Sequence, residues 1–312
     1  MLFAGNGSAQ DFALATKSVP VKPKAELIYL SEEKSSLWIT GCCKIQEKEN
    51  SKSMKVVILA GGKGSRISEE SVLKPKPMVE IGDKPILWHI MKIYSAYGYH
   101  DFIVCCGYKG HIIKDYFVHY YMYQSDATFH LKDKQREYHN STAEPWRITL
   151  ANTGLETLTA GRILRIKDYI GDDGTFMLTY GDGVADVDIP ALLAFHREHG
   201  RIVTITTTQP AGRFGAIKID DHGNIESFKE KARKDQSWVN AGFMVLNREI
   251  FDYLGDGSEM LEASPFERLA ADHQMAAYRH PGFWSPMDTV HDRAYLEGLW
   301  SSGRAAWKIW ES

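Results

Sequence analysis

A stretch at residues 61–66 combines glycines with cationic side chains. It reads GGKGSR and comprises Gly61, Gly62, Lys63, Gly64, Ser65 and Arg66. Glycines let the backbone approach a ligand closely, and successive N–H groups can form an anion-binding nest. The lysine and the arginine add positive charge beside those N–H groups. The stretch therefore predicts a binding loop for a polyphosphate; the alternative is a tight glycine turn without a ligand.

Two common phosphate-binding loops do not match this stretch. The P-loop pattern G-x-x-x-x-G-K-[ST] is absent from the sequence. The dinucleotide-binding pattern G-x-G-x-x-G requires a glycine where Ile67 stands. The predicted loop therefore belongs to neither class.

Lys76 is a second candidate for phosphate chemistry. It follows Arg66 by ten residues and stands between Pro75 and Pro77. The prolines restrict the backbone and disfavour helix, so we expect a rigid extended segment that holds the ammonium steady. As a point charge, a lysine suits a phosphate whose negative charge grows in the transition state. The alternative is an ordinary exposed lysine in a loop.

Two aspartates are candidate site residues by their positions. Asp182 lies in TYGDGVAD, just after a predicted buried strand, and Asp288 lies in PGFWSPMDT, 106 positions later. The alternatives are a turn residue for Asp182 and a helix N-cap for Asp288. We interpret Asp186 and Asp188 mainly as turn and cap residues.

The elements that must position these residues alternate along the chain. Continuous apolar runs predict buried strands, and apolar residues at helical spacing predict helices between them. We expect strands at Val56–Ala60, Phe102–Cys106, Thr175–Tyr180 and Ile202–Thr208, and helices around Leu87–Tyr94, Ile113–Tyr120 and Ile189–His196. This alternation predicts an α/β fold with a doubly wound, mostly parallel, Rossmann-like sheet. In such sheets ligands bind at the carboxyl ends of the strands, which is where the glycine stretch and Asp182 fall.

Shorter elements follow in the second half of the chain. Ala216–Ile219 and Phe243–Leu246 predict a small mixed β part, and helices are expected near the C-terminus. Ser264-Pro265-Phe266-Glu267 predicts a helix start, with Ser264 as the capping residue and Glu267 completing a capping box.

Composition limits the classes of function. The chain has 312 residues, 44% of them apolar, and a net charge of −3, which favours neither a nucleic-acid nor a membrane partner. The four cysteines form two adjacent pairs without zinc-site spacing, and no signal-peptide pattern is present, so we expect a cytoplasmic protein. Residues 1–53 hold only isolated apolar segments, which predicts a loosely ordered extension before one domain at residues 54–312.

The glycine motif and the lysine together resemble a known family. Leu59-Ala60-Gly61-Gly62-x-Gly64-Ser65-Arg66 with Pro75-Lys76 is similar to the sugar-1-phosphate nucleotidylyltransferases. The resemblance covers roughly residues 54–311 and is strongest to the glucose-1-phosphate cytidylyltransferases. The stretches that carry it are KPKPMVEIGDKPILWHI, DFIVCCGYKG, YGDGVADVDI, PGFWSPMDT and YLEGLW.

The resemblance implies a reaction and its partners. CTP and glucose 1-phosphate would give CDP-glucose and pyrophosphate, through direct in-line attack by a sugar-phosphate oxygen on the α-phosphorus. The attacking group is already an anion, so neither a general base nor a covalent protein intermediate is needed. The aspartates that match Asp182 and Asp288 hold Mg²⁺ in this family. Its members also imply a homo-oligomer, a trimer or a hexamer.

The resemblance also implies roles for individual residues. Arg66 and Lys76 would be catalytic. The nucleotide would contact Leu59, Ala60, Gly61, Gly62, Lys63, Gly64, Ser65, Arg66, Lys76, Thr157, Arg162 and Gly181. The sugar phosphate would contact Glu230, Lys231, Asn240 and Gly242 in the small mixed β part. Ala232 replaces the proline that usually follows the Glu-Lys pair, which affects the expected rigidity of that loop.

Three interpretations stay open at this point. The first is a cytidylyltransferase, and the second is a nucleotidylyltransferase that uses UTP, dTTP or another sugar 1-phosphate. The third is a non-catalytic regulatory subunit that senses sugar nucleotides. Such a subunit would typically have lost the loop arginine, the lysine or an aspartate, and Arg66, Lys76, Asp182 and Asp288 are all present.

Overall fold

The computed structural model of the protein describes residues 54–64, 73–209, 216–219, 225–229 and 238–311, the two short segments by their backbone alone. The predicted N-terminal extension lies outside these ranges and stays a prediction. None of the helices in the described part combines the length and apolarity that crossing a lipid bilayer requires.

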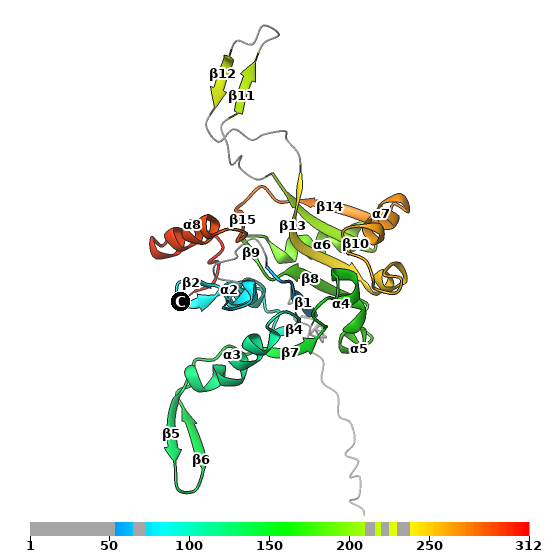
Figure 1. Cartoon of the computed structure of the whole chain (residues 1–312). Coiled ribbons are helices and arrows are strands. Elements are labelled where there is room, and N and C mark those ends of the chain that lie inside the picture. The colour runs from blue at the N-terminus through cyan, green and yellow to red at the C-terminus, as the bar shows by residue number, and fades with distance from the viewer. Residues whose placement is uncertain (1–53, 65–72, 210–215, 220–224, 230–237, 312) are drawn as a thin grey trace, which may run out of the picture. The chain divides into compact units, whose positions relative to one another are not determined.

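A seven-stranded sheet forms the centre of the fold (Figure 1). Its strand order is β14-β10-β13-β8-β1-β4-β7, and β13 runs antiparallel to both of its neighbours while the other pairs are parallel. The strands are β1 (Lys55–Ala60), β4 (Asp101–Cys106), β7 (Arg147–Asn152), β8 (Thr175–Tyr180), β10 (Val203–Thr208), β13 (Val239–Asn247) and β14 (Met275–Arg279). The predicted doubly wound, mostly parallel sheet is confirmed.

Helices cover both faces of this sheet. They are α2 (Ile86–Ala96), α3 (Gly110–Tyr123), α4 (Thr159–Arg165), α5 (Lys167–Ile170), α6 (Ile189–His199), α7 (Ser264–Ala271) and α8 (Val290–Ser301), with short 3₁₀ helices η1 (Lys76–Met78) and η2 (Arg248–Tyr253). Alternate residues of β1 face opposite sides, so Val56 and Ile58 join a core with α2, α6 and α8. Val57 and Leu59 join a second core with α4, α5 and α7.

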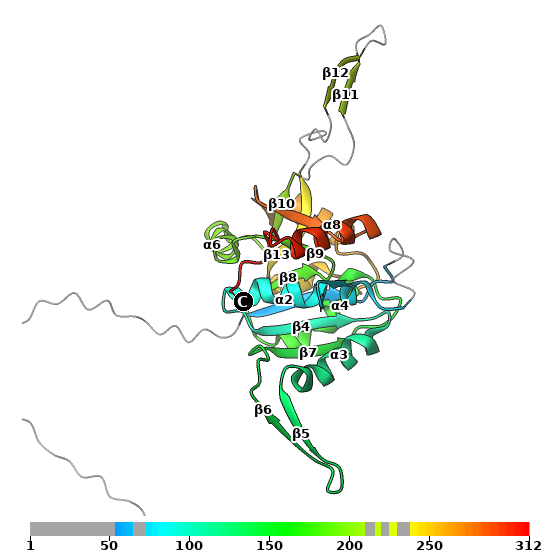
Figure 2. The same ribbon diagram turned by 90° about the vertical axis from the view of Figure 1, so that its left-hand side faces the viewer.

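Short two-stranded pairings complete the described elements. They are β2 (Glu80–Ile81) with β3 (Lys84–Pro85), β5 (Asp126–His130) with β6 (Gln135–His139), β9 (Gly183–Ala185) with β15 (Trp284–Pro286), and β11 (Ala216–Ile219) with β12 (Ile225–Lys229). The β5–β6 hairpin follows the end of α3, which lies along β7 (Figure 2). This hairpin and β7 were not predicted from the sequence.

The order of the strands creates a switch point beside β1. After β1 the chain builds β4 and β7 on one side and then returns to build β8 on the other side of β1. Connections leave β1 and β8 in opposite directions, which opens a crevice at the carboxyl ends of these two strands. The glycine stretch follows β1 and Gly181 follows β8, and Gly181 N donates a hydrogen bond to Leu59 O at 3.0 Å.

Two predicted helix caps have different outcomes. The capping box predicted at Ser264 is wrong, because Ser264 is already the first helical residue of α7 and the N-cap is Ala263, which makes no side-chain cap. The interpretation of Asp188 as a cap is confirmed, since its Oδ1 accepts a hydrogen bond from Ala191 N at the start of α6.

Candidate active site

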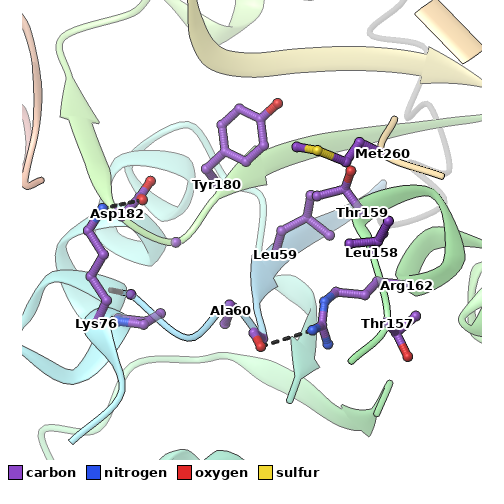
Figure 3. Close-up of a pocket in the computed structure, with 15 residues that line it drawn as sticks. Leu59, Ala60, Lys76, Thr157, Leu158, Thr159, Arg162, Tyr180, Asp182 and Met260 are labelled. Carbon is purple, nitrogen blue, oxygen red and sulfur yellow. Dashed lines mark hydrogen bonds and ion pairs between the residues drawn. The ribbon is translucent and has the colours of Figure 1, made fainter. Parts of the chain in front are cut away.

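A cavity of about 250 Å³ lies at the carboxyl ends of β1 and β8. Figure 3 shows Lys76 and Asp182 on one side of it and Arg162 on the other, with Ala60 between them. The predicted residues that line it are Leu59, Ala60, Gly61, Gly62, Gly64, Lys76, Thr157, Arg162, Gly181 and Asp182. The fold thus gathers residues from four separate parts of the sequence around one space. Ser65 and Arg66 lie outside the described residues.

Lys76 joins the two candidate aspartates. Its Nζ lies 2.6 Å from Asp182 Oδ2 and 2.6 Å from Asp288 Oδ1, and its side chain is 10% exposed. Burial opposes the charged form, but the charges of the two aspartates and the hydrogen bonds that they accept outweigh it and raise the pKa of Lys76 above its ordinary value. The ammonium is therefore a fixed positive charge at neutral pH, held at the edge of the cavity.

The backbone around Lys76 differs in one respect from the predicted extended segment. Pro75 is extended, with φ −66° and ψ 149°, but Lys76 begins the 3₁₀ helix η1, and Met78 N donates to Pro75 O at 2.8 Å. The expectation of an extended segment throughout was wrong, because Pro77 stands in the first turn, where a missing N–H does no harm. The short helical turn places the lysine, and its ion pairs with Asp182 and Asp288 hold the ammonium in position.

The two aspartates are brought together by local strand pairing. Asp182 immediately precedes β9, and Asp288 is the second residue after β15. Pro286 pairs with Gly183 in the β9–β15 ladder, and Met287 N donates to Asp182 O at 2.8 Å. The carboxylates therefore approach Lys76 from two adjacent backbone segments. Among the described residues, no group of three or more acidic, histidine or cysteine side chains is placed to hold a metal ion.

Arg162 anchors the first part of the glycine stretch. Its Nη2 donates to Gly61 O at 2.9 Å, and its Nη1 donates to Gly154 O at 2.9 Å and to Thr153 Oγ1 at 2.7 Å. Burial, together with the charge of Arg165, lowers the pKa of Arg162. The guanidinium lines the cavity while it binds backbone carbonyls of loops that follow β1 and β7. Its predicted contact with a nucleotide stays a prediction.

Lys63 does not line the cavity. It forms an ion pair with Glu156 at 2.7 Å, and both side chains are more than half exposed. Exposed pairs of this kind contribute only about 0–1 kcal/mol, so the lysine can exchange this partner for an anionic ligand at little cost.

The predicted sugar-phosphate residues lie partly within the described structure. Glu230 and Lys231 are outside it. Asn240 and Gly242 lie on β13 beside a register shift in the β10–β13 ladder. The expectation that this segment belongs to a small mixed β part was wrong, because β13 is a strand of the central sheet. Gly242 N donates to Asn240 Oδ1 at 2.8 Å, and Gly242 adopts φ +86° with the Tyr180 ring against it. A Cβ at this glycine would lie 2.7 Å from Tyr180 Cδ2, so both the backbone conformation and the packing require glycine.

Sequence analysis missed several residues of the cavity wall. They are Pro77, Leu158, Thr159, Tyr180 and Met260. Pro77 and Tyr180 are direct neighbours of predicted residues, and Thr159 is two positions from Thr157. Their closeness in sequence to the motifs could therefore have identified them as site residues. Burial and the nearby Glu262 carboxylate raise the pKa of Tyr180, so its hydroxyl donates a hydrogen bond to Glu262 even well above neutral pH.

Comparison with known proteins identifies close relatives by sequence. The chain is 52% identical over 258 residues to a glucose-1-phosphate cytidylyltransferase of Salmonella typhi, covering 83% of this chain and 100% of the relative. It is 45% identical to a probable glucose-1-phosphate cytidylyltransferase of Bacillus subtilis, covering 82% and 100%.

Solved structures share the fold at lower identity. HddC from Yersinia pseudotuberculosis superimposes with a TM-score of 0.57 at 20% identity, covering 79% of this chain and 99% of that one. UTP-bound UGPase from Acinetobacter baumannii superimposes with a TM-score of 0.59 at 16% identity, covering 79% and 93%. The nucleotidyl transferase family model matches residues 55–298. With the relatives that are 52% and 45% identical, this match shows that the chain belongs to the nucleotidyl transferase family.

Proposed function

We propose that this protein transfers the cytidylyl group of CTP to glucose 1-phosphate, with release of pyrophosphate and formation of CDP-glucose. The observation that carries the choice of both substrates is the 52% identity over the full length of the Salmonella typhi glucose-1-phosphate cytidylyltransferase. The site supports the chemistry, because a glycine-lined cavity and a fixed ammonium suit a reaction between two anions.

The obstacle in this reaction is electrostatic repulsion, and the described residues address it. A sugar-phosphate oxygen attacks the α-phosphorus of the triphosphate, and pyrophosphate leaves on the opposite side. Glycine-loop N–H groups bind the phosphates, and Lys76 neutralises charge that grows on the phosphoryl oxygens. Arg66, in the same sequence stretch, is proposed to add a second positive charge. The attacking oxygen is already ionised, so no side chain has to remove a proton or form a bond to phosphorus.

We propose that Asp182 and Asp288 hold Mg²⁺ during the reaction. Their carboxylates converge on one positive charge in this structure, the Lys76 ammonium, so the fold brings two hard oxygen ligands to one place. Mg²⁺ needs only one or two carboxylates when phosphate oxygens and water complete its shell. When bound, the ion would withdraw charge from the phosphate oxygens.

We also propose that the chain assembles with copies of itself, in the cytoplasm. An apolar groove of about 350 Å³ lies between α3 and the edge strand β7, and Val118 on α3 is 73% exposed beside it. The β5–β6 hairpin that follows α3 carries Leu131 in its turn, 87% exposed. One chain thus supplies both a groove and an exposed leucine in a turn whose other residues are charged, and two copies that exchange them bury the groove and the leucine. Cys105 and Cys106 are buried free thiols, which suits a reducing compartment.

The direct test is pyrophosphate release measured across a grid of nucleoside triphosphates and sugar 1-phosphates. We expect the highest kcat/KM with CTP and glucose 1-phosphate, and dependence on Mg²⁺. A preference for UTP, dTTP or another sugar would replace the proposed substrates and keep the reaction type. Absence of turnover with every pair would contradict the enzymatic function and favour a sensing subunit.

A further inference from the structure

Glu262 connects the two halves of the candidate site, although it belongs to no sequence motif. It lies between η2 and α7, and its side chain is only partly exposed. Oε1 accepts a hydrogen bond from the Tyr180 hydroxyl, and Oε2 accepts one from Thr159 Oγ1 at 2.7 Å. Tyr180 and Thr159 both line the cavity. A carboxylate only accepts hydrogen bonds, so it commits both hydroxyls to donate toward it.

One arm of this connection leads to the proposed sugar-phosphate side. Because the Tyr180 hydroxyl donates to Glu262, its oxygen accepts on the other side, where Asn240 Nδ2 lies at 3.4 Å. Asn240 Oδ1 accepts from Gly242 N, so the orientation of the amide is fixed from both ends. An amide with a fixed orientation distinguishes the hydroxyls of a sugar by their donor and acceptor directions.

The other arm leads to the proposed nucleotide side. Thr159 is the first residue of α4, and its Oγ1 accepts from Leu261 N at 2.7 Å while it donates to Glu262. Arg162 follows within the same short helix and holds Gly61 O. The position of Thr159 therefore sets the helix that fixes the glycine loop.

We propose that Glu262 is a positioning residue that couples the sugar-phosphate subsite to the nucleotide subsite, through Tyr180 on one arm and Thr159 on the other. The proposal rests on the proposed function, because it assigns the two subsites from that reaction. It assigns no bond-making or bond-breaking role to Glu262. It predicts that a substitution in one arm weakens the binding of one substrate, and that a substitution of Glu262 weakens the binding of both.

Three near-isosteric variants test this division. Tyr180→Phe should raise the KM for glucose 1-phosphate about fivefold, the usual effect of one lost hydrogen bond, with the KM for CTP nearly unchanged. Thr159→Val should raise the KM for CTP by a similar factor and spare the sugar phosphate. Glu262→Gln should raise both, because its NH₂ reverses the direction of one hydrogen bond. Glu259→Gln, an exposed glutamate in the same loop, is the matched control and should leave both KM values unchanged.

A double variant separates coupling from simple loss of structure. In the Glu262→Gln background, Tyr180→Phe should add much less than it does alone, because the two changes remove one shared interaction. Independent, fully additive effects would overturn the coupling. The coupling would also be overturned if Tyr180→Phe and Thr159→Val both changed the KM for the same substrate, or if neither of them changed a KM. Melting temperatures identify any variant whose kinetic change comes from partial unfolding. Tyr180→Phe keeps the aromatic ring against Gly242, so its KM values then decide whether the coupling exists.

Equilibrium binding keeps this test separate from the proposed reaction. Dissociation constants for CTP and for glucose 1-phosphate, measured by calorimetry on the same variants, should show the same division between the arms. If the wild-type protein binds both ligands with this division but has no turnover, the proposed function fails and the inference stands. If it turns both over and the division is absent, the inference fails alone. Absence of binding to either ligand overturns both.

Discussion

Lys76 and Asp182 stand 106 residues apart in the chain, and their side chains meet at 2.6 Å at the edge of the cavity. Asp288, a further 106 positions along, meets the same ammonium at the same distance. Two negative charges and one positive charge therefore share a partly buried space. This arrangement determines what each substitution in the site is expected to do.

Lys76→Ala should lower kcat by roughly 10²–10³, the usual effect of removing one preorganised group that stabilises transition-state charge. Steady-state pyrophosphate release with CTP and glucose 1-phosphate measures it. Lys74→Ala is the matched control, since Lys74 lies in the same segment but pairs with Glu80 at a partly exposed position. Nearly unchanged turnover in Lys76→Ala would remove this lysine from its catalytic role.

Asp182→Asn should raise the Mg²⁺ concentration needed for half-maximal activity by roughly 10- to 100-fold, because an amide is a poorer ligand than a carboxylate for a hard cation. A magnesium titration of activity at saturating substrates is the measurement. Asp188→Asn serves as the control, as Asp188 caps α6. An identical titration curve for the Asp182 variant would refute the metal assignment.

Gly61→Ala should disturb the nucleotide loop. The new Cβ would lie 2.1 Å from Arg162 Nη1, so either the guanidinium or the loop must move. We expect a lower melting temperature and a loss of about one to two orders of magnitude in kcat/KM for CTP. Gly62→Ala meets no atom within 4 Å and should keep the wild-type melting temperature. Equal stability of the two variants would contradict the anchoring role of Arg162.

His89 should make the fold sensitive to acid. The ring is fully buried, and Nε2 donates to Ile81 O at 2.8 Å while Nδ1 accepts from Trp307 Nε1 at 3.4 Å. Burial, with the charge of Lys84, lowers its pKa to about 4. Above pH 6.5 the ring is neutral in both folded and unfolded states, and this histidine adds no pH dependence.

Between pH 6.5 and 4 the unfolded state binds a proton that the folded state does not. The free energy of unfolding should therefore fall as the pH falls through this window, by at most about 3 kcal/mol from this residue. Urea unfolding at pH 7 and at pH 4.5 measures the difference. His89→Gln should reduce this pH dependence, whereas His111→Gln, at an exposed position, should not. An unreduced pH dependence in His89→Gln would assign the acid sensitivity to other groups.

Val118→Glu should weaken self-association, because it places a charge beside the apolar groove of α3. Light scattering coupled to size-exclusion chromatography gives the solution mass of each variant. Tyr169→Glu alters a comparably exposed apolar residue on α5 and should leave the mass unchanged. A monomeric wild-type protein would contradict the proposed assembly, and an unaltered oligomer in Val118→Glu would place the interface elsewhere.

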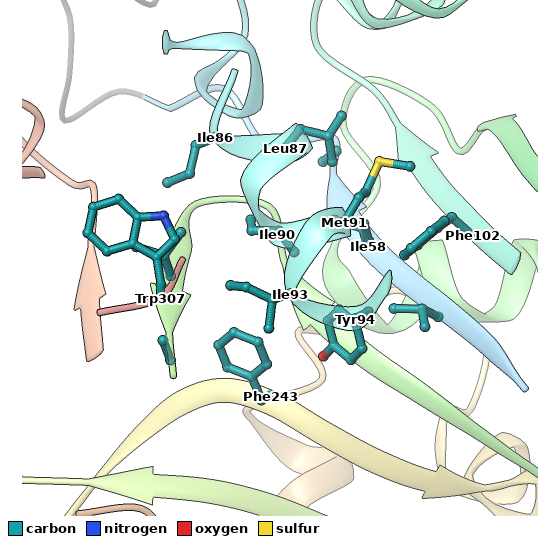
Figure 4. Packing of buried hydrophobic residues seen from close by; sticks show 14 of the residues in the cluster. Ile58, Ile86, Leu87, Ile90, Met91, Ile93, Tyr94, Phe102, Phe243 and Trp307 are labelled. Atoms are coloured by element: carbon teal, nitrogen blue, oxygen red, sulfur yellow. The ribbon is translucent and has the colours of Figure 1, made fainter. Parts of the chain in front are cut away.

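The buried part of the fold was largely predictable from the sequence, because apolar runs and helical spacing report burial directly. Leu87, Ile90, Met91 and Tyr94 were recognised by their spacing, and all four lie in the core (Figure 4). β7 was missed because only one of its six residues is fully buried and RITLAN contains no long apolar run. The β5–β6 hairpin was missed for the same reason, since its residues are mostly exposed.

The candidate site was predictable where residue types carry the signal. The glycines with cations and the lysine between prolines carried the prediction in combination, since the lysine alone also fits an ordinary exposed position in a loop. Glu262 had no such signal: it stands in an ordinary polar segment, 82 residues from Tyr180. Arg162 was recognised as a site residue, but its contacts with Gly61 O and Gly154 O depend on three-dimensional proximity that the sequence does not encode locally.

The short β9–β15 ladder ties the two carboxylates of the site to each other through the backbone. Asp182 directly precedes β9 and Asp288 stands two residues after β15, so the position of each carboxylate depends on the pairing of both strands. A substitution that breaks this ladder would therefore displace both carboxylates from Lys76 together, although it alters neither of them.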